Sequence, residues 1–337
     1  MSIQAVGNKF RAFVVEAVDG TFTHRVKNKN ITDLPENELL VEVHYSSLNY
    51  KDALSASGNK GVTRNFPHTP GIDAAGVVVH DKSGKFLPGD KVIVTSYDLG
   101  MNTDGGFAEY ICVPSEWAVS LPSGMTLKKS MQLGTAGLTA AISVSELAAK
   151  VKPEDGSMLV TGATGGVGSL AVKMLSLLGY KVCALTGKTD ASDYLKELGA
   201  QSILSRDEFL KENNRPMLKD KWSGVVDCVG GEVLNCAIKS TSPQGVITCC
   251  GMAGSAELNL TVFPFILRGV RLIGIDSQNF PMELRVKTWA EMADLFLNND
   301  LDFMTTTISI GELSEAIENL LAAKQTGRKL IEITDSK

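Results

Sequence analysis

The stretch Leu159-Val-Thr-Gly-Ala-Thr-Gly-Gly-Val-Gly168 decides the fold. It starts as a short apolar run, continues as a glycine-rich turn and leads into an amphipathic helix, although Ala163 stands where the G-x-G-x-x-G pattern has its first glycine. Glycines in such a turn let the backbone approach a pyrophosphate and let the helix pack closely on the strand, while the N–H groups at the helix start attract an anion. The stretch predicts a dinucleotide site, against the alternative of a turn that binds nothing. The predicted contact residues are Thr164, Gly165, Gly166, Val167 and Gly168.

Short apolar runs alternate with helical patterns around this turn, which is typical of βα units. Strands are predicted at 158–161, 181–185, 202–204, 224–227, 245–250 and 270–274. Helices are predicted between them at 167–178, 192–198, 207–213 and 232–241. Six strands joined by helical crossovers predict an α/β fold with a doubly wound parallel sheet in the order 3-2-1-4-5-6.

The flanking residues have a different texture. Between about residues 10 and 122 short β-like runs alternate with Gly, Pro, Asn and Asp, and 39–46 shows the alternation of a half-buried strand. This predicts a small, irregular β-barrel-like domain. A helix at 290–297, a strand near Thr307, a helix at 312–324 and a strand at 329–333 follow the parallel array. We therefore expect a nucleotide-binding domain at 128–276, inserted between 1–127 and 277–337 of the catalytic domain.

Two other phosphate-binding motifs can be tested on the sequence. The tripeptide GKT at 187–189 matches the end of a P-loop, but the pattern requires a glycine where Val182 stands. The segment 161–168 also fits the T-G-x-x-x-G-x-G pattern of short-chain dehydrogenases, which implies a downstream Tyr-x-x-x-Lys. Neither later tyrosine, Tyr180 or Tyr194, has a lysine four places on. Both interpretations fail.

The end of the second strand indicates which dinucleotide binds. An Asp or Glu about 20 residues after the glycines would hold the ribose 2′-hydroxyl of NAD, but this strand ends in Thr186-Gly187-Lys188. A hydroxyl and a cation suit a 2′-phosphate, and Arg206 after the third strand is a second candidate cation. NADPH is therefore the expected cofactor. The alternative is that Lys188 is a solvated surface lysine.

Composition excludes several other classes of function. The 337 residues carry 33 basic and 38 acidic side chains, a net charge of −5 that gives no global attraction to nucleic acid or an anionic membrane. The least charged long window, 131–149, is diluted with Gly, Thr and Ser, so no membrane span is expected. The six cysteines show no C-x-x-C spacing, and the N-terminus does not have the layout of a signal peptide. We expect a cytoplasmic protein with a small-molecule partner.

Several separated motifs carry a further signal. They are 46–53 (SSLNYKDA), 64–67 (RNFP), 70–73 (PGID), 134–139 (GTAGLT), 264–268 (PFILR) and 327–328 (GR). Together they resemble the medium-chain dehydrogenase/reductase superfamily, and within it the zinc-independent quinone oxidoreductase-like branch. They look closest to the YhdH/YhfP group, which includes NADPH-dependent acryloyl-CoA reductases. This resemblance implies a GroES-like β-rich catalytic domain plus a doubly wound Rossmann domain.

No metal site is expected. A catalytic zinc needs convergent Cys, His or carboxylate ligands, yet the chain has only four histidines, none in an H-E-x-x-H pair, and the first 150 residues hold the single cysteine Cys112. In zinc-dependent members of the superfamily, ligands occur at the places of Asn49, Gly71–Asp73 and Thr135. Without a Lewis acid, reduction of an activated C=C fits better than oxidation of an alcohol.

The predicted catalytic residues are Asn49 and Tyr50, in the N-Y-K-D element that the resemblance places at a cleft. Asn49 would bond the substrate carbonyl or the nicotinamide ribose, and Tyr50 would contact the nicotinamide and donate a proton or hydrogen bond to the enolate. Water is the alternative proton source, and Asp52 is expected to anchor the loop. The alternative is that all three residues only satisfy a local turn.

The resemblance implies further cofactor contacts. Thr135 would touch the nicotinamide or its ribose, unless it serves only as a helix N-terminal hydroxyl. Cys250 and Gly251 end the fifth strand and would line the pocket with backbone, because strand ends face the ligand crevice. A nucleophilic Cys250 is not expected. Ser277 and Arg328 complete the set, with a plain surface arginine as the alternative for Arg328; Arg64 is a weaker candidate for acyl-CoA phosphates.

The leading functional hypothesis is NADPH-dependent, metal-free reduction of the conjugated C=C of a small enoyl-CoA or enone, with acryloyl-CoA as the best guess. NADPH:quinone oxidoreduction is the enzymatic alternative, and a cofactor-binding protein without turnover is the non-enzymatic one. The long apolar run at 270–275 is expected at a sheet edge, which invites pairing with another chain. The resemblance implies a homodimer through this sixth strand.

Overall fold

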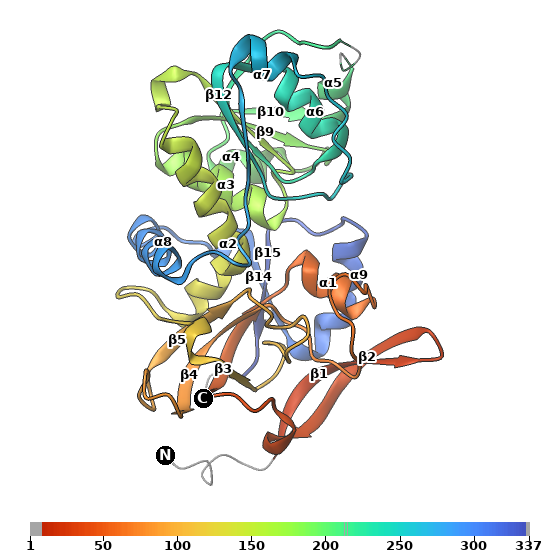
Figure 1. Cartoon of the computed structure of the whole chain (residues 1–337), viewed down its shortest axis with the longest axis vertical. Helices are drawn as coiled ribbons and strands as arrows, with labels where there is room; N and C mark the ends of the chain where they lie inside the picture. The colour runs from red at the N-terminus through yellow and green to blue at the C-terminus, as the bar shows by residue number, and fades with distance from the viewer. Residues whose placement is uncertain (1–8, 212, 214, 335–337) are drawn as a thin grey trace. The chain divides into compact units, whose positions relative to one another are not determined.

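The computed structural model describes residues 9–211, 213 and 215–334, which divide into two compact units (Figure 1). Unit 1 comprises Met1–Thr135 and Gln278–Lys337, and unit 2 comprises Ala136–Ser277. The chain therefore leaves unit 1 after Thr135 and returns to it at Gln278. The domain borders expected after residues 127 and 276 stay predictions.

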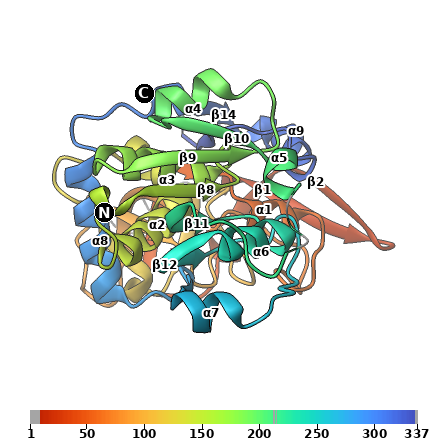
Figure 2. The same cartoon turned by 90° about the horizontal axis from the view of Figure 1, so that it is seen from above.

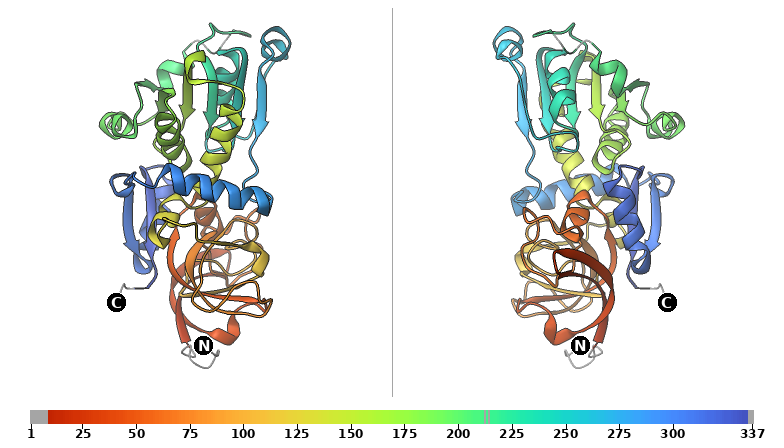
Figure 3. Two further views of the ribbon diagram at one scale, coloured as in Figure 1. Left: turned by 90° about the vertical axis from the view of Figure 1, so that its left-hand side faces the viewer. Right: turned by 90° about the vertical axis from the view of Figure 1, so that its right-hand side faces the viewer.

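Unit 2 is built on a parallel sheet with the predicted strand order. Figure 2 shows β10, β9, β8, β11 and β12 side by side, and Figure 3 shows β13 at the edge. The prediction of a doubly wound sheet with a 3-2-1-4-5-6 order is confirmed. In spatial order the strands are β10 (Ser202–Ser205), β9 (Lys181–Thr186), β8 (Ser157–Thr161), β11 (Trp222–Asp227), β12 (Thr241–Cys249) and β13 (Arg271–Gly274).

Helices connect these strands as crossovers. Helices α3 and α4 contact each other, as do α5 and α6, which is the pairing expected when right-handed crossovers place neighbouring helices on a common face. Strand β8 is buried along Met158–Thr161 because both of its neighbours are strands and both faces of the sheet are covered. The helices are α3 (Gly166–Leu177), α4 (Ser192–Leu198), α5 (Arg206–Leu210), α6 (Gly231–Lys239) and α7 (Phe263–Arg268).

Two predicted helix ends in unit 2 are wrong. Helix α5 ends at Leu210 instead of residue 213, because Asn213 and Pro216 are poor helix formers. Residue 212 lies outside the described part of the chain. Helix α6 ends at Lys239, and β12 already begins at Thr241. The hydroxyls of Ser240 and Thr241 donate to carbonyls of the last helical turn at 2.7 and 2.8 Å, which ends the helix.

Unit 1 is β-rich, as predicted. Its main sheet has the order β14-β15-β3-β4-β5-β7, with β6 also paired to β3, and a separate hairpin joins β1 (Lys9–Val18) to β2 (Thr21–Asn30). Strand β3 is more buried than the expected half-buried strand, because it pairs with β15, β4 and β6. The bounds are β3 (Leu39–Ser47), β4 (Asp73–Asp81), β5 (Lys91–Thr95), β6 (Tyr110–Val113), β7 (Ala118–Ser120), β14 (Thr305–Ser309) and β15 (Arg328–Glu332).

The helices of unit 1 are α1 (Tyr50–Ala56), α8 (Met282–Leu295) and α9 (Leu313–Leu321). The prediction that α8 begins at residue 290 is wrong, because a buried arginine interrupts its apolar pattern. Arg285 is 0% exposed, donates to the carbonyl of Thr95 at 3.0 Å and lies over the Tyr97 ring at 4.4 Å. The last helix was predicted at 312–324, whereas α9 begins one residue later and ends three residues earlier.

Helix α2 (Leu127–Ala148) begins in unit 1 and ends in unit 2, and no helix was predicted in this segment. It contains a break at Gly134, whose backbone has φ 55° and ψ −155°. It also covers most of the sparsely charged window at 131–149. Across 9–211, 213 and 215–334, no helix combines the length and the apolar character that a bilayer crossing demands.

Candidate functional site

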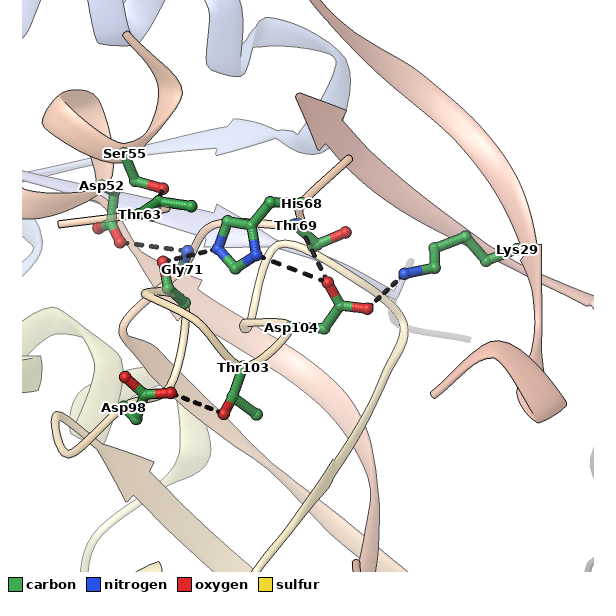
Figure 4. A network of polar contacts seen from close by, with 11 residues as sticks. Lys29, Asp52, Ser55, Thr63, His68, Thr69, Gly71, Asp98, Thr103 and Asp104 are labelled. Atoms are coloured by element: carbon green, nitrogen blue, oxygen red, sulfur yellow. Dashed lines mark hydrogen bonds and ion pairs between the residues drawn. The ribbon is translucent and has the colours of Figure 1, made fainter. Parts of the chain in front are cut away.

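The start of α1 is fixed by Asp52, whose carboxylate is completely buried. It accepts the backbone N–H groups of Asn49 and Ile72, both at 2.8 Å. It also accepts the backbone N–H of Gly71 at 3.1 Å (Figure 4). Burial, and after it the nearby Asp73, raises the pKa of Asp52 to about 7. These bonds tie the helix start to the 71–72 segment, so the prediction that Asp52 anchors its loop is confirmed.

A second acid holds the same segment from its other end. Asp104 accepts the backbone N–H of Thr69 at 3.1 Å and forms an ion pair with Lys29 (Figure 4). His68 lies 3.8 Å from Asp104, donates Nε2–H to the Gly100 carbonyl at 2.9 Å and has its pKa lowered by burial. The backbone that leads into β4 is therefore fixed before it reaches Asp73.

Asp73 is the centre of a buried hydrogen-bond network. Its carboxylate accepts the Ser47 hydroxyl at 2.5 Å and the Asn49 amide at 2.7 Å. It also accepts the Thr135 backbone N–H at 2.9 Å and the Thr135 hydroxyl at 2.6 Å. The two carboxylate oxygens can accept all of these hydrogen bonds. The network joins β3, β4 and the kink of α2.

Arg328, the first residue of β15, lies against this network and is 2% exposed. Its guanidinium donates to the Ser47 hydroxyl at 2.8 Å, to Asn49 Oδ1 at 3.2 Å and to the Gln132 carbonyl at 3.1 Å. The surface position considered for Arg328 is therefore wrong. These contacts favour a role for Arg328 in positioning Ser47 and Asn49 over direct binding of a phosphate.

The amide of Asn49 is held on both sides. Its oxygen accepts from Arg328, and its nitrogen donates to the Ser47 carbonyl at 3.2 Å and to Asp73 at 2.7 Å. An amide nitrogen has two hydrogens, so both are used. This favours a positioning role for Asn49 over a direct bond to a substrate carbonyl.

Gly134 lets α2 approach the network closely. A Cβ at this residue would overlap Asp73 Oδ2, lie 2.5 Å from Ser47 Oγ and require an L residue at φ 55°. The next residue, Thr135, uses its hydroxyl hydrogen for the bond to Asp73. The Ser96 hydroxyl must therefore be the donor in its 3.0 Å contact with Thr135 Oγ1. The break in α2 thus turns two groups of Thr135 toward one carboxylate.

Tyr50 is the first residue of α1 and is 49% exposed. Its neighbour Asn49 is fixed in the network, which sets the backbone from which Tyr50 projects. Unit 1 therefore presents an accessible phenol next to a rigid polar centre. A phenol of this kind can donate a hydrogen bond or a proton.

Unit 2 carries the glycine turn between β8 and α3. Gly162 has φ 59°, Gly165 precedes the first helical residue, and its N–H donates to the Gly162 carbonyl at 2.9 Å. A Cβ at Gly168 would overlap the same carbonyl, so only glycine permits this packing of helix on turn. The N–H groups at the start of α3 have no partner inside the helix, which makes them candidates for a phosphate.

The residues expected to choose the dinucleotide lie together after β9. The Lys188 N–H donates to the Thr186 hydroxyl at 3.0 Å, and the Arg206 guanidinium lies within 3.2 to 3.4 Å of the point where a Gly187 Cβ would be. Burial lowers the pKa of Lys188. Two cations and a hydroxyl therefore lie at the 186–188 turn, and the nearest carboxylate in sequence, Asp190, follows the turn and acts on the Lys188 charge.

The other predicted contacts in unit 2 lie at strand ends. The Cys250 N–H donates to the Asp227 carbonyl at 3.0 Å, which holds the end of β12 against β11. Gly251 packs on Cys228, where a Cβ would overlap the Cys228 carbonyl. Ser277 accepts from the Thr139 hydroxyl at 2.8 Å.

Two family models match the chain in the order of its units. The alcohol dehydrogenase GroES-like domain matches residues 35–123, and the zinc-binding dehydrogenase model matches residues 166–298. YhfP of Bacillus subtilis is 42% identical over 96% of this chain and 99% of its own length. AcuI of Escherichia coli is 40% identical over the same shares, and the acrylyl-CoA reductase AcuI of Ruegeria pomeroyi is 38% identical over the same shares.

This chain belongs to the YhdH/YhfP group of the medium-chain dehydrogenase/reductase superfamily. Solved members of the group have the same fold. The YhdH oxidoreductase of Salmonella enterica, in complex with NADP, has a TM-score of 0.93 and 39% identity over 96% of this chain and all of that one. YhfP of Bacillus subtilis, with NAD bound, has a TM-score of 0.93 and 41% identity over 97% of this chain and all of that one. The GroES-like and Rossmann domains expected from the sequence are thereby confirmed.

In this chain, three places where the superfamily can carry zinc ligands meet in one network. Asn49, Asp73 and Thr135 supply an amide, a carboxylate and a hydroxyl, whereas zinc prefers thiolate and imidazole. Among the residues that the structure describes, no group of three or more His, Cys, Asp or Glu side chains is arranged to hold a metal ion. Hydrogen bonds to Asp73 connect these three side chains.

Sequence reasoning missed part of this medium-chain dehydrogenase site. Asp73 was named only as part of a motif and of a place where zinc-dependent relatives carry a ligand, and Ser47 and Gly134 were given no role. One signal was present: Asp73 stands directly before the apolar strand residues AAGVVV, and an acid there must be buried and bonded. Nothing local to Ser47 marks it, because its partners lie 26 and 281 residues away.

Proposed function

We propose that this protein is an NADPH-dependent oxidoreductase that reduces the activated C=C of a small α,β-unsaturated thioester, with acryloyl-CoA as substrate and propionyl-CoA as product. The observation that carries the proposal is full-length similarity, at 38%, to a protein named acrylyl-CoA reductase. The AcuI relative from Escherichia coli, at 40% identity, supports it further.

We infer that NADPH binds unit 2 through its glycine turn, with Thr164, Gly165, Gly166, Val167 and Gly168 around the pyrophosphate and the N–H groups at the start of α3 toward it. Thr186, Gly187, Lys188 and Arg206 would hold the 2′-phosphate, because two cations and a hydroxyl lie there and β9 ends in Thr186 instead of the carboxylate that would bond the ribose of NAD. Relatives solved with NADP and NADPH support this choice. Thr135, Cys250, Gly251, Ser277 and Arg328 remain proposed contacts.

The bound cofactor would supply a hydride to the β-carbon of the substrate. The residues of unit 1 would serve the second half of the reaction, in which the enolate takes a proton at its α-carbon. Tyr50 is the proposed donor because its phenol is exposed and its backbone is fixed by Asn49. Asn49, held by Arg328 and Asp73, would keep Tyr50 in place.

Quinone reduction is the second candidate. The name of the YhfP relative, which is 42% identical, assigns it to quinone oxidoreductases. A quinone is also an activated acceptor of hydride, so the same cofactor residues would serve it. A protein that binds NADPH without turnover is the remaining alternative.

We also propose a homodimer through β13, in the cytoplasm. Strand β13 is a sheet edge, and α7 directly before it exposes apolar side chains that a partner chain would cover. The six cysteines are all free, which suits a reducing compartment. The exposed residues are Val262, Phe263, Ile266 and Leu267.

Parallel NADPH oxidation assays with acryloyl-CoA and with a benzoquinone test the function. The proposal expects kcat/KM for acryloyl-CoA to exceed that for the quinone, and stoichiometric formation of propionyl-CoA by mass spectrometry. Faster turnover of the quinone would favour the second candidate. Tight NADPH binding with no oxidation by either acceptor would favour a protein without turnover.

A further inference from the structure

Two thiols meet at the carboxyl edge of the unit 2 sheet. Cys228 follows β11 and Cys250 follows β12, and the two sulfur atoms lie 3.8 Å apart. The strands are parallel neighbours in which Asp227 pairs with Cys249, so the next residue of each strand brings the cysteines side by side. Both thiols are free and half-buried.

The backbone around this pair suits a disulfide. The Cys250 N–H donates to the Asp227 carbonyl at 3.0 Å, and the Gly254 N–H donates to the Val229 carbonyl at 2.8 Å, so the two segments are held together. Neighbouring strands are about 4.8 Å apart. A disulfide accepts Cα atoms about 4.4 to 6.8 Å apart, so closure requires side-chain rotation and little backbone movement.

The other cysteines have different surroundings. Cys183 and Cys236 are buried, and Cys112 belongs to unit 1. Cys249 is half-buried like the pair, but its sulfur contacts the Asp227 carboxylate at 3.9 Å and the Gly251 carbonyl at 4.0 Å. Cys249 therefore serves as a matched internal control.

We propose that Cys228 and Cys250 are a thiol-modification site that closes reversibly to a disulfide with a low-molecular-weight disulfide, such as oxidised glutathione, as oxidant. We propose further that NADPH slows this closure. This second part rests on the proposed function, in which Cys250 and Gly251 contact the cofactor. Oxidation of the two thiols then competes with binding of NADPH to the neighbouring cofactor site, so a high NADPH concentration keeps the two thiols reduced.

The step balances as two thiol–disulfide exchanges. One thiol of the pair loses its proton and becomes the first nucleophile. This thiolate attacks one sulfur of oxidised glutathione, forms a mixed disulfide and releases glutathione thiolate. The second thiol of the pair, 3.8 Å away, then loses its proton, attacks the protein sulfur of the mixed disulfide and releases the second glutathione. The protein loses two electrons and two protons, and two glutathione molecules are formed.

Non-reducing peptide mass spectrometry of the full-length protein after exposure to oxidised glutathione tests the site. We expect a Cys228–Cys250 cross-link in the unaltered protein. Cys228→Ser should instead accumulate a stable glutathione adduct on Cys250, and Cys249→Ser should close the cross-link at the unaltered rate. An absent cross-link in the unaltered protein, or one that joins Cys249 to either partner, would overturn the site.

The same measurement with NADPH tests the competition, and cofactor fluorescence reports binding separately. NADPH at about ten times its Kd should slow closure about tenfold, because only the unoccupied protein reacts. Bound NADPH with an unchanged rate overturns the competition while leaving the proposed cofactor standing. If NADPH does not bind, both the proposed cofactor and the proposed competition are wrong. The presence or absence of the Cys228–Cys250 cross-link still tests the thiol site independently.

Discussion

Asn49 and Tyr50 are adjacent in sequence but have opposite environments. The Asn49 amide is fixed by Arg328, Ser47 and Asp73, whereas the Tyr50 side chain is 49% exposed. This arrangement suits a reactive side chain, because the fixed neighbour holds its backbone in place while its own polar atom stays accessible. At the residue scale, Tyr50 is therefore the group whose removal should affect chemistry and leave folding intact.

Replacing Tyr50 with Phe is expected to lower kcat about 100-fold or more, the usual contribution of a positioned proton donor. The Kd for NADPH should change by less than about twofold, since the phenyl ring stays in place. Stopped-flow NADPH oxidation under saturating acryloyl-CoA measures the first quantity and fluorescence titration the second. Full kcat in the variant would mean that water supplies the proton.

Asp52 should give the protein a characteristic pH dependence of stability. Its folded pKa is about 7, above the ordinary 3.8, because burial and Asp73 disfavour its charged form. Between these values the folded state holds a proton that the unfolded state has lost. The free energy of unfolding should therefore fall as pH rises from about 4 to about 7, by up to about 1.4 kcal/mol per pH unit.

Urea unfolding at a series of pH values measures this slope, with Asp52→Asn as the comparison. An asparagine does not titrate, so this contribution should disappear in the variant. Parallel slopes in the two proteins would contradict the assignment to Asp52.

How far the sequence predicts single residues depends on the range of their contacts. The glycines of the 162–168 turn act through local backbone geometry, which a sequence motif encodes. Their position between a strand and a helix was therefore predicted correctly. Arg328 was expected to face a ligand or solvent, because a lone arginine in sequence carries no sign of burial. Its partners Ser47 and Asn49 lie 281 and 279 residues away.

At the scale of elements, the kink in α2 depends on Gly134. Alanine there would combine an unfavourable φ of 55° with overlap onto Asp73 and Ser47, so Gly134→Ala should destabilise unit 1 by roughly 2–4 kcal/mol. Gly84→Ala is the matched control, because Gly84 has φ 75° with nothing within 4 Å of its Cβ position. Thermal unfolding compares the two. Equal losses would mean that backbone strain alone matters.

The turn after β9 should set the choice of cofactor. Lys188→Ala is expected to raise KM for NADPH about 10- to 100-fold, the value of one charge-assisted bond, while KM for NADH changes little. Lys181→Ala, an exposed lysine at the opposite end of β9, is the control. Steady-state kinetics with both cofactors measures the effect. Equal losses for NADPH and NADH would remove the 2′-phosphate assignment.

Elements were predicted best where their pattern is strongly periodic and apolar. The parallel strands of unit 2 fall close to their expected positions, because each is a short buried run between helices. Helix α8 was predicted to begin late, since Arg285 looks polar in sequence but is buried against Thr95 and Tyr97. No helix was predicted where α2 lies, because Gly134 and the Gly, Thr and Ser residues around it weaken the helical pattern of the sequence.

For the whole molecule, the exposed apolar residues of α7 predict self-association. Ile266 is 68% exposed beside the edge strand β13, so Ile266→Glu should convert a dimer into a monomer at micromolar concentration. Leu87→Glu, at an equally exposed leucine of unit 1, should leave the dimer intact. Light scattering coupled to size exclusion measures both. A monomeric unaltered protein would refute the dimer.

The return of the chain to unit 1 has a consequence for synthesis on the ribosome. Unit 2 is continuous, so it can begin to fold as soon as residue 277 has emerged, whereas the unit 1 sheet waits for β15 to enter between β14 and β3. That last strand also brings Arg328 to Ser47 and Asn49. Until then the early-made half of unit 1 keeps an open sheet edge at β3 and an incomplete polar centre. During the interval between the synthesis of β3 and that of β15, this chain therefore exposes a strand edge with which another chain can pair.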